Sequence, residues 1–584
     1  MTIDAIGLKH GIDQSSLVHN YLHSYERELR VLECSVSTVA IISGSNTAAV
    51  AKTFSESLPN AKIVVLQVGS AAVDIDAAQW PQITVHKARN LAEMHLQLAK
   101  LPDLQLLVED GTNRKSEKLA IFRELFLYVD DGGLYVAEDL HASHLPKYVD
   151  SDGENVWQFI SRLLDLKAEP VQPGTKTTSD DRELAAAIDR VINYGKIAFV
   201  TKRGNHLLKI RDHQATEILE GRFGSNWGHL ISLRKAGTFR SKATVSTNRH
   251  DLDYRFKKDI AFPAHHLREY SNAVCSPGQV ALLNDVVLPD SFRHLLGRRL
   301  TNKFLTDSSP FHARMSPAPD ESPDFLAGNY FYLDTEYPNV YGHIPTEVIS
   351  RLWGWNESKV LYPNLKALVS PKLGERDIPT YEIKILNAFG ISDADIVRIS
   401  HPTRVERLLA ATPMFSNPKY VVPEIDSVWS TISKNLRSNI SSGIDKVFLS
   451  RQTGLARNCR NSTAVEAMFR QHGFTILRPE ALPLGDQIEL FSGASVVAGY
   501  GGSALLNGVF SDHPSTRIVI APDTYNTANE YLISSITGDD FHYFWCKADV
   551  PHPPDRWTWE AFESPYEFDF DRDGDQLDKL LASL

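Results

Sequence analysis

The chain has 584 residues, of which 42% are hydrophobic, 23% charged and 9% aromatic. This length is several times that of a typical domain of about 150 residues, so we expect three domains. The composition is close to the average of soluble globular proteins, which excludes a largely disordered, collagenous or coiled-coil chain. The formal net charge of −11 argues against a nucleic-acid binder that depends on overall positive charge.

Cysteine spacing and the N-terminal segment indicate the compartment. Cys34, Cys275, Cys459 and Cys546 lie far apart without a Cys-x-x-Cys pair, which predicts neither a disulfide framework nor a zinc finger. The N-terminus lacks a basic stretch followed by an apolar one, and no run of about 18 apolar residues occurs. We expect no transmembrane segment and a cytoplasmic protein, working in the cytosol or at the inner face of the membrane.

The N-terminal third alternates short apolar runs with helical segments, which predicts βαβ units and a parallel sheet. The strands are expected at 36–42, 61–66, 83–85, 104–108 and 133–140. A helix over 180–192 is expected to precede an antiparallel hairpin formed by 196–201 and 206–210.

Domain limits follow from changes in composition along the chain. The Pro- and Gly-containing stretch 168–181 indicates a loop within the first domain, whereas 215–265 is basic and irregular and 307–324 is rich in Pro and Ser. Helices are expected to dominate 325–430, and a second alternating series begins at residue 446. We therefore predict an α/β protein with three domains, at 1–215, 216–430 and 431–584.

A phosphate-binding arrangement is predicted after the first strand of this second series. The strand ends in Ser450 and Arg451, the next loop holds Arg457 and Arg460, and a helix opens near Asn461. Guanidinium groups beside a helix N-terminus attract a diphosphate. Later in the series, a strand enters the glycine turn of 499–502, where a ligand can approach backbone amides.

Segment 446–510 resembles the motif region of glycosyltransferase family 61, in which a strand ending in Ser-Arg and a basic loop precede a Gly-Phe…Pro-Glu…Leu…Gln…Phe segment and a final Gly-x-His-Gly-Ala-x-Leu-x-Asn. The family histidine is replaced here by Gly501 and the alanine by Ser503, so any contact of that histidine is absent or supplied elsewhere. The resemblance implies a donor site that includes Glu480, Gly502 and Asn507. The matching positions are Ser450, Arg451, Arg457 or Arg460, Asn461, Gly473, Phe474, Pro479, Glu480, Gln487, Phe491, Gly499, Gly502, Leu505 and Asn507.

The stretch 325–355 resembles the second recurring segment of the same family, in which a Gly-His turn leads into a helix. His343 and Glu347 are four residues apart and are expected on one helix face. In an inverting transfer, one side chain must take the proton of the acceptor hydroxyl, and His343 is the first candidate. Asp334, Glu336 and Glu347 are the carboxylate alternatives. The His-x-x-x-Glu spacing lacks the third ligand of a zinc motif, so no metal is expected.

Segment 106–140 resembles class I methyltransferases that use S-adenosylmethionine, with Glu109, Asp110, Glu138 and Asp139 as the matching acidic residues. Three positions depart from that pattern. The glycine-rich loop is represented by Ser-Gly-Ser-Asn-Thr-Ala-Ala at 43–49, and the ribose-binding acid and the histidine after Asp-Gly are represented by Gln67 and Asn113. We therefore expect a non-catalytic relative that binds S-adenosylmethionine weakly or not at all.

Together the resemblances imply a Rossmann-like methyltransferase-type domain followed by the two Rossmann-like lobes of a GT-B glycosyltransferase. The expected reaction is inverting transfer of a sugar from a nucleotide sugar to a hydroxyl of a glycan in bacterial surface polysaccharide synthesis. A UDP-sugar is our hypothesis for the donor. No cofactor and no nucleic-acid partner are expected, and a homo-oligomer is left open. The alternatives are an active glycan O-methyltransferase with a carbohydrate-binding GT-B half, and a non-catalytic carbohydrate-binding scaffold.

Overall fold

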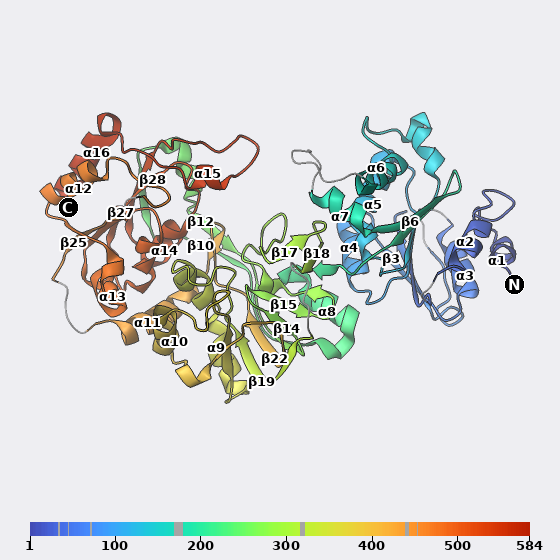
Figure 1. Cartoon of the computed structure of the whole chain (residues 1–584), viewed down its shortest axis with the longest axis horizontal. Helices are drawn as coiled ribbons and strands as arrows, with labels where there is room; N and C mark the ends of the chain where they lie inside the picture. The colour runs from blue at the N-terminus through green and yellow to red at the C-terminus, as the bar shows by residue number, and fades with distance from the viewer. Residues whose placement is uncertain are drawn as a thin grey trace. The chain divides into compact units, whose positions relative to one another are not determined.

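The computed structural model describes the chain apart from residues 33–34, 45, 70–72, 169–178, 316–321, 439–442 and 453. Cys34 and most of the expected loop at 168–181 lie outside the described residues, as do parts of 43–49 and 307–324. Figure 1 shows the chain coloured from its N-terminus to its C-terminus. Two compact units form: the first from Met1–Trp227, Leu282–Pro289 and Arg298–Asp320, the second from Gly228–Ala281, Asp290–Gly297 and Glu321–Leu584.

The first unit is built on a sheet that has seven strands in the described part of the chain, in the order β3-β2-β1-β4-β5-β7-β6. Strands β1 to β5 run parallel, and β7 runs antiparallel to both of its neighbours. The chain winds outward from β1 in both directions, so the topological switch point lies between β1 and β4. The strands are β1 (Thr38–Ser43), β2 (Lys62–Gln67), β3 (Ile83–Lys87), β4 (Leu106–Asp110), β5 (Leu134–Ala137), β6 (Ile188–Asn193) and β7 (Ala198–Lys202).

Helices cover both faces of this sheet, because successive strand residues point to opposite sides. Ala40 and Ile42 of β1 belong to a core with α4, α5 and α6, whereas Val39 and Ile41 belong to a core with α2 and α3. The helices are α1 (Ile3–His10), α2 (Leu22–Leu29), α3 (Thr47–Ser57), α4 (Leu91–Ala99), α5 (Lys115–Leu125), α6 (Val156–Ala168), α7 (Ser179–Ala187) and α8 (Ala215–Phe223).

Two expectations for this unit are wrong. The helix predicted over 180–192 ends at Ala187, and the β-branched run that follows forms β6, in which Val191 pairs with Val200. The hairpin partner of β7 is therefore β6 and not the later segment. That segment, β8 (Leu207–Lys209), pairs instead with β16 (Val286–Val287) and β18 (His312–Met315), and β17 (Leu305–Asp307) pairs with β18.

The second unit contains a parallel sheet of six strands among the described residues, in the order β11-β29-β28-β27-β25-β26. From β25 onward this is a doubly wound order in which the switch point lies between the first strand, β25, and the third, β27. Its strands are β11 (Thr244–Thr247), β25 (Lys446–Leu449), β26 (Thr475–Leu477), β27 (Val496–Tyr500), β28 (Thr516–Pro522) and β29 (Asp540–Cys546). Its helices are α12 (Ser462–Gln471), α13 (Leu484–Gly493), α14 (Asn529–Thr537), α15 (Trp559–Phe562) and α16 (Phe570–Ser583).

A mixed sheet forms the other half of the second unit. Strand β22 runs parallel to β19 and antiparallel to β13 and β14, and β19, β20 and β21 are parallel. The strands are β9 (Gly228–Arg234), β13 (His265–Ser271), β14 (Val274–Ser276), β19 (Asp324–Tyr332), β20 (Lys366–Val369), β21 (Ile396–Arg398) and β22 (Thr403–Ala411). The helices are α9 (Trp353–Leu361), α10 (Thr380–Phe389) and α11 (Asp426–Leu436).

The mixed α/β architecture predicted from the sequence is confirmed, with corrections in the middle of the chain. Segment 325–430 is not dominated by helices, because its aromatic and β-branched runs form strands that are buried in the sheet. Segment 215–265 is not irregular: it supplies β9, β11 and the antiparallel pair β10 (Gly237–Arg240) and β12 (Asp259–Phe262). The limits expected after residues 215 and 430 fall within α8 and α11.

One hydrophobic core joins the two sheets of the second unit. It includes Phe331 and Ala367 from the mixed sheet together with Val447, Val497 and Val519 from the parallel sheet. A shared core fixes the two sheets in one body, so side chains from both can meet at a single site.

Candidate active site

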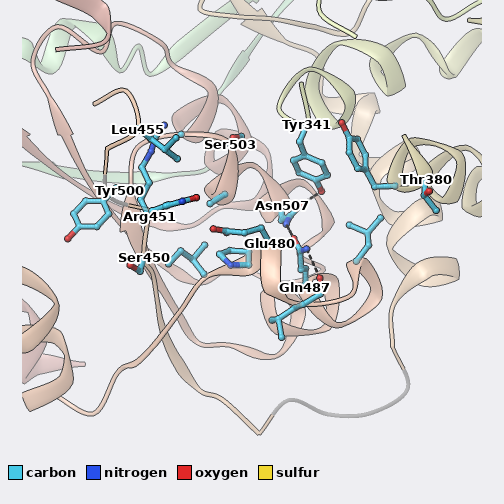
Figure 2. Close-up of a pocket in the computed structure, with 18 of the residues that line it drawn as sticks. Tyr341, Thr380, Ser450, Arg451, Leu455, Glu480, Gln487, Tyr500, Ser503 and Asn507 are labelled. Atoms are coloured by element: carbon cyan, nitrogen blue, oxygen red, sulfur yellow. Dashed lines mark hydrogen bonds between the residues drawn. The ribbon is translucent and has the colours of Figure 1, made fainter. Parts of the chain in front are cut away.

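A cavity of about 620 Å³ lies at the carboxyl ends of β25, β26 and β27 (Figure 2). Ser450 and Arg451 follow β25, Glu480 follows β26, and Gly502 and Ser503 follow β27, and all five line the cavity. In doubly wound sheets, the crevice at the switch point is where ligands bind. The cavity therefore occupies the position that this topology favours for a nucleotide.

Two guanidinium groups flank the glycine turn after β27. A Cβ atom built on Gly502 would lie 3.0 Å from Nη1 of Arg451 and 3.8 Å from Nη2 of Arg457. Gly502 has φ 151°, and the missing side chain leaves room for both groups. Arg451 also donates to the carbonyl of Gly501 at 3.2 Å.

These two arginines contact groups other than carboxylates. Among the residues that the structure describes, none brings a carboxylate oxygen within ion-pair distance of either guanidinium. Arg457 lies over the rings of Tyr525 and Phe562, at 4.8 and 5.0 Å. Burial and the neighbouring Arg457 lower the pKa of the Arg451 guanidinium, although arginine stays charged in proteins. Two adjacent arginines without a carboxylate in direct contact form a candidate site for an anion, although Glu480 and Glu530 are near enough to interact electrostatically with Arg451 and Arg457, respectively.

Two of the arginine-loop residues predicted from the sequence lie elsewhere. Arg460 pairs with Asp549 and, at 3.7 Å, with Glu567, and it lines a separate hollow beside α16. Asn461 lines the same hollow, and its amide donates to the carbonyl of Phe568 at 2.8 Å. Neither residue lines the cavity at the switch point.

Gly501, where the family pattern has histidine, lies in a tightly packed position. A Cβ atom there would lie 2.9 Å from Cβ of Ala521 and 3.0 Å from the ring of Tyr525. These distances are shorter than normal carbon contacts. The space that a histidine side chain would need is therefore filled by Tyr525 of the same unit.

The wall opposite the arginines comes from residues that the sequence did not single out. Tyr341, Thr380, Tyr381 and Lys384 line the cavity, and all but Tyr341 belong to α10. Tyr341 comes two residues before the predicted His343 and is the one residue of this wall near a motif. The α10 residues carry no local pattern that points to a ligand.

A chain of hydrogen bonds ties Tyr341 to the donor-site motif (Figure 2). The Tyr341 hydroxyl donates to Oδ1 of Asn507, and the Asn507 amide donates to Oε1 of Gln487 at 2.8 Å. Gln487 in turn donates to the carbonyl of Leu482 at 3.0 Å. Asn507 and Gln487 thus hold the wall in place.

His343 and Glu347 contact each other, as their spacing predicts. His343 Nδ1 lies 3.0 Å from Oε1 of Glu347, and Arg293 binds the same carboxylate at 2.6 Å. The imidazole stacks on Tyr337 with ring centroids 4.8 Å apart. In a neutral imidazole whose Nδ1 proton is donated to this carboxylate, the lone pair is on Nε2.

His343 adjoins the cavity wall without being one of its lining residues. A Cβ atom on Gly342 would lie 3.2 Å from the side chain of Ser503, so the turn that holds His343 touches the donor-site motif. Burial alone would raise the pKa of the Glu347 carboxyl, but His343 and Arg293 outweigh burial and hold that pKa well below its usual range. Glu347 is therefore an ionised orienting group and a poor proton acceptor.

The other two carboxylates proposed as bases are buried. Asp334 accepts from the backbone of Gln279 at 2.8 Å and of Thr335 at 2.9 Å, and from the hydroxyl of Ser370. Burial raises the pKa of Asp334. Glu336 is 6% exposed, and neither carboxylate lines the cavity. Both residues follow β19 in the chain and are buried inside the second unit.

Glu530 is a further residue at the glycine turn that the sequence did not indicate. Its buried carboxylate accepts from the backbone N–H of Gly502 at 3.0 Å and from the Tyr525 hydroxyl at 3.2 Å. Burial raises the pKa of this carboxyl. This contact fixes the glycine turn. It also occupies the backbone amide of Gly502, which the sequence predicted as a ligand-binding group.

Glycines of three loops approach one another closely at the switch point of the first unit. A Cβ atom on Gly44, which follows β1, would lie 2.6 Å from the carbonyl of Gly111, which follows β4. One on Gly69, which follows β2, would lie 2.9 Å from the carbonyl of Gly44. Three loops that would surround a cofactor therefore touch each other.

Side chains from the segments before β1 donate hydrogen bonds to three acidic residues at this switch point. Gln14 donates to Asp110 at 2.9 Å and to Glu138 at 3.2 Å, and Tyr25 donates to Glu138 at 2.5 Å. Tyr21 donates to Asp139 at 2.8 Å. Glu109, the fourth matching residue, is paired with Lys118 inside the unit. The acidic residues of the methyltransferase pattern thus serve internal contacts.

No cluster of three or more His, Cys, Asp or Glu side chains suited to a metal ion occurs within the described ranges. In the same part of the chain, no helix combines the length and apolar character needed to cross a membrane.

Part of the second unit is similar to a known family. The model of the family Glycosyltransferase 61 matches residues 341–519, which include the cavity, both arginines and His343. The resemblance predicted from the sequence is thereby confirmed for this segment, and the match supports a glycosyltransferase.

The N-terminal region resembles a methyltransferase, as predicted. A 2'-O-methyltransferase of 8-demethyl-8-alpha-L-rhamnosyl tetracenomycin-C from Streptomyces olivaceus is 31% identical over 108 residues, which are 18% of this chain and 28% of that protein. Two crystal structures of MycE, a methyltransferase from the mycinamycin biosynthetic pathway in complex with Mg and SAH, align with 35% of this chain and 54 or 55% of theirs. Their identities are 20 and 19%, each with a TM-score of 0.30.

Proposed function

We propose that this protein is an inverting, metal-independent glycosyltransferase of GT-B type. It would move a sugar from a nucleotide sugar to a hydroxyl of a glycan, in the cytoplasmic assembly of a bacterial surface polysaccharide. One observation carries the proposal: Arg451 and Arg457 flank Gly502 without a carboxylate partner among the described residues, inside the segment that matches the family.

The arginine pair suits the leaving group of such a transfer. When the bond between the anomeric carbon and the diphosphate breaks, negative charge develops on the diphosphate. Fixed positive groups at the carboxyl end of β25 and beside the turn after β27 stabilise that charge. A nucleoside diphosphate fits a cavity of about 620 Å³, and we propose a UDP-sugar as the donor.

His343 is our candidate for the base. Its Nε2 would take the proton of the acceptor hydroxyl while the hydroxyl oxygen attacks the anomeric carbon from the side opposite the diphosphate. Glu347, ionised and held by Arg293, would orient the imidazole and stabilise its protonated form. The new bond from the hydroxyl oxygen then forms on the face of the anomeric carbon opposite the breaking bond to the diphosphate, which inverts the configuration of that carbon.

The test is a screen of UDP-sugars for diphosphate release, combined with calorimetric binding of UDP. Arg451→Ala should weaken UDP binding by about 1.5–3 kcal/mol, the range for hydrogen bonds to charged groups. Arg460→Ala is the matched control, because Arg460 is paired with Asp549 away from the cavity, and it should leave the affinity unchanged. Equal UDP affinity in wild type and Arg451→Ala would refute the assignment.

A non-catalytic carbohydrate-binding protein is the second candidate, favoured by one observation. Gly501 replaces the family histidine, and the packing of Tyr525 leaves no room for another side chain there. The same screen separates the two candidates, because a scaffold would bind UDP or glycan without releasing diphosphate. An active methyltransferase receives less support, because the acidic residues of the first unit's switch point are engaged in internal hydrogen bonds.

A further inference from the structure

Two tryptophans expose their rings just before and within α15, which is labelled in Figure 1. Trp557 is 42% exposed and Trp559 is 56% exposed. Their ring centroids lie 4.7 Å apart at an angle of 76°, and both rings pack on Phe562, at 5.4 and 5.6 Å. Large aromatic surface left in water is unfavourable, and a cluster of it marks a site where a ligand removes that surface from solvent.

The segment that carries these rings is held in one conformation. His552 accepts from the backbone N–H of Thr558 at 3.2 Å and binds the carbonyl of Thr524 at 3.0 Å through its other nitrogen. The Thr558 hydroxyl accepts from the backbone of Ala561 at 3.4 Å. A surface that is already ordered loses little conformational entropy when a ligand binds.

Phe562 connects the tryptophans to the cationic end of the cavity. The guanidinium of Arg457 lies 5.0 Å from the Phe562 ring, and the Arg457 backbone donates to the carbonyl of Glu563 at 2.9 Å. The same guanidinium borders Gly502 at the diphosphate end. The exposed rings and the phosphate-binding groups are thus neighbours within the second unit.

The charges around the rings indicate the kind of ligand. Asp555, Glu560 and Glu563 are exposed and adjoin the tryptophans in sequence, where Arg556 is the exposed cation of residues 551–563. The half-buried Arg457 is a second cation, in contact with Phe562. An excess of carboxylates repels anionic lipid and anionic polymers. Carboxylates accept hydrogen bonds from hydroxyl groups, and the flat faces of tryptophan pack against the C–H faces of a pyranose ring. A neutral glycan satisfies both.

We propose that Trp557 and Trp559 form a stacking platform for sugar rings of a neutral glycan acceptor, which they hold beside the diphosphate end of the donor cavity. The description of this glycan as an acceptor rests on the proposed glycosyltransferase function. The binding of a neutral glycan at these rings stands on the exposure, rigidity and charge of the segment itself.

The experiment measures binding to the full chain by calorimetry, with cellohexaose and the fully N-acetylated chitohexaose as neutral probes and hexagalacturonate as the anionic one. At least one neutral hexasaccharide should bind, and the double variant Trp557→Ala/Trp559→Ala should weaken it by about tenfold or more. UDP affinity should not change. Leu373→Ala is the matched control, because Leu373 is an exposed apolar residue, at 85%, remote in sequence from the platform.

Single Trp→Phe variants keep the inference testable if the double variant does not fold. They retain a smaller ring and should bind with intermediate affinity. Absence of binding by both neutral probes, unchanged affinity in the variants, or tryptophan-dependent binding to phosphatidylglycerol vesicles would overturn the platform.

Failure of the platform and failure of the transferase proposal give different results. If UDP binding depends on Arg451 but glycan binding ignores the tryptophans, the platform is wrong and the transferase proposal stands. If glycan binding needs the tryptophans but no donor is turned over, the platform stands and the transferase proposal falls. Where turnover is found, the double variant should raise KM for the glycan without changing kcat.

Discussion

At the scale of single residues, Gly501 explains a departure from the family pattern. The residue lies between the end of β27 and the cavity, and its missing Cβ atom is what allows Ala521 and Tyr525 to approach it. Tyr525 is also the ring on which the Arg457 guanidinium rests, at 4.8 Å. The loss of the histidine and the placement of Arg457 are therefore two consequences of one packing arrangement.

Gly501→Ala should destabilise the second unit by about 1–3 kcal/mol, because the added methyl group overpacks the contact with Ala521 and Tyr525. Gly574→Ala, within α16, is the control: its Cβ atom would meet Phe570 at an ordinary 3.6 Å. That change should be neutral or stabilising by up to about 1 kcal/mol, because alanine favours a helix. Chemical denaturation measures both, and equal stability of the two variants would contradict the packing argument.

His343→Ala should lower turnover by about 10²–10⁴-fold, the usual contribution of a positioned base, while UDP affinity stays close to that of the wild type. Glu347→Gln should cost less, because the imidazole keeps its stacking partner Tyr337. Steady-state kinetics with an active donor measure both variants. Near-normal turnover of His343→Ala, together with loss of activity in Asp334→Asn or Glu336→Gln, would assign the base to a carboxylate instead.

At the scale of elements, the segments before β1 supply hydrogen-bond donors to the acidic residues at the switch point of the first unit. Tyr25 of α2 and Gln14 before it donate to Glu138, which is buried at the end of β5. Burial raises the pKa of Glu138 from 4.5 to about 7, so the folded protein holds a proton there that the unfolded chain releases at lower pH.

Glu138 should make the free energy of unfolding depend on pH. Because its folded pKa is the higher one, its stabilising contribution is fully present below about pH 4.5 and is lost as the pH rises to about 7. Over that window the wild type should lose about 1–3 kcal/mol relative to Glu138→Gln, which cannot ionise. Denaturation curves at several pH values measure the difference. Parallel pH profiles of the two proteins would show that Glu138 ionises normally in the fold.

At the scale of the whole molecule, the two units differ at equivalent places. Both have a doubly wound sheet, and in both the chain after the first strand reaches the switch point. In the second unit that place is a cavity lined by Arg451, with Arg457 beside the same glycine turn, whereas in the first unit Gly44 closely approaches Gly69 and Gly111. The same topology thus supports a ligand site in one unit and internal packing in the other.

Calorimetric titration of the full chain with S-adenosylmethionine should show no binding in the low micromolar range. The cofactor would need the volume that the contacts of Gly44 with Gly69 and Gly111 remove, and Gln67 cannot supply the carboxylate that holds a ribose diol. UDP serves as the positive control for the same sample. A low micromolar dissociation constant, or methyl transfer to a glycan, would show that these loops open and that the first unit is active.

The sequence by itself determined the elements and motifs that depend on neighbouring residues. The alternating runs of both units, the strand that ends in Ser450 and Arg451, and the glycine turn after β27 are all visible in it. The contact of His343 with Glu347 is equally local, because four residues bring two side chains to one face of a helical turn. The segment that matches the glycosyltransferase family also followed from such patterns.

Only the tertiary structure decided which of these residues share a site. It turned Arg457 toward Gly502 and Arg460 toward Asp549, brought Tyr341 to Asn507, added β11 to the parallel sheet, and brought the switch-point loops of the first unit together. Each of these contacts joins residues far apart in the chain, and its existence depends on how whole sheets and loops pack. Local patterns record the preferences of a short segment for a helix, strand or turn, whereas the partner of a side chain is selected by long-range packing.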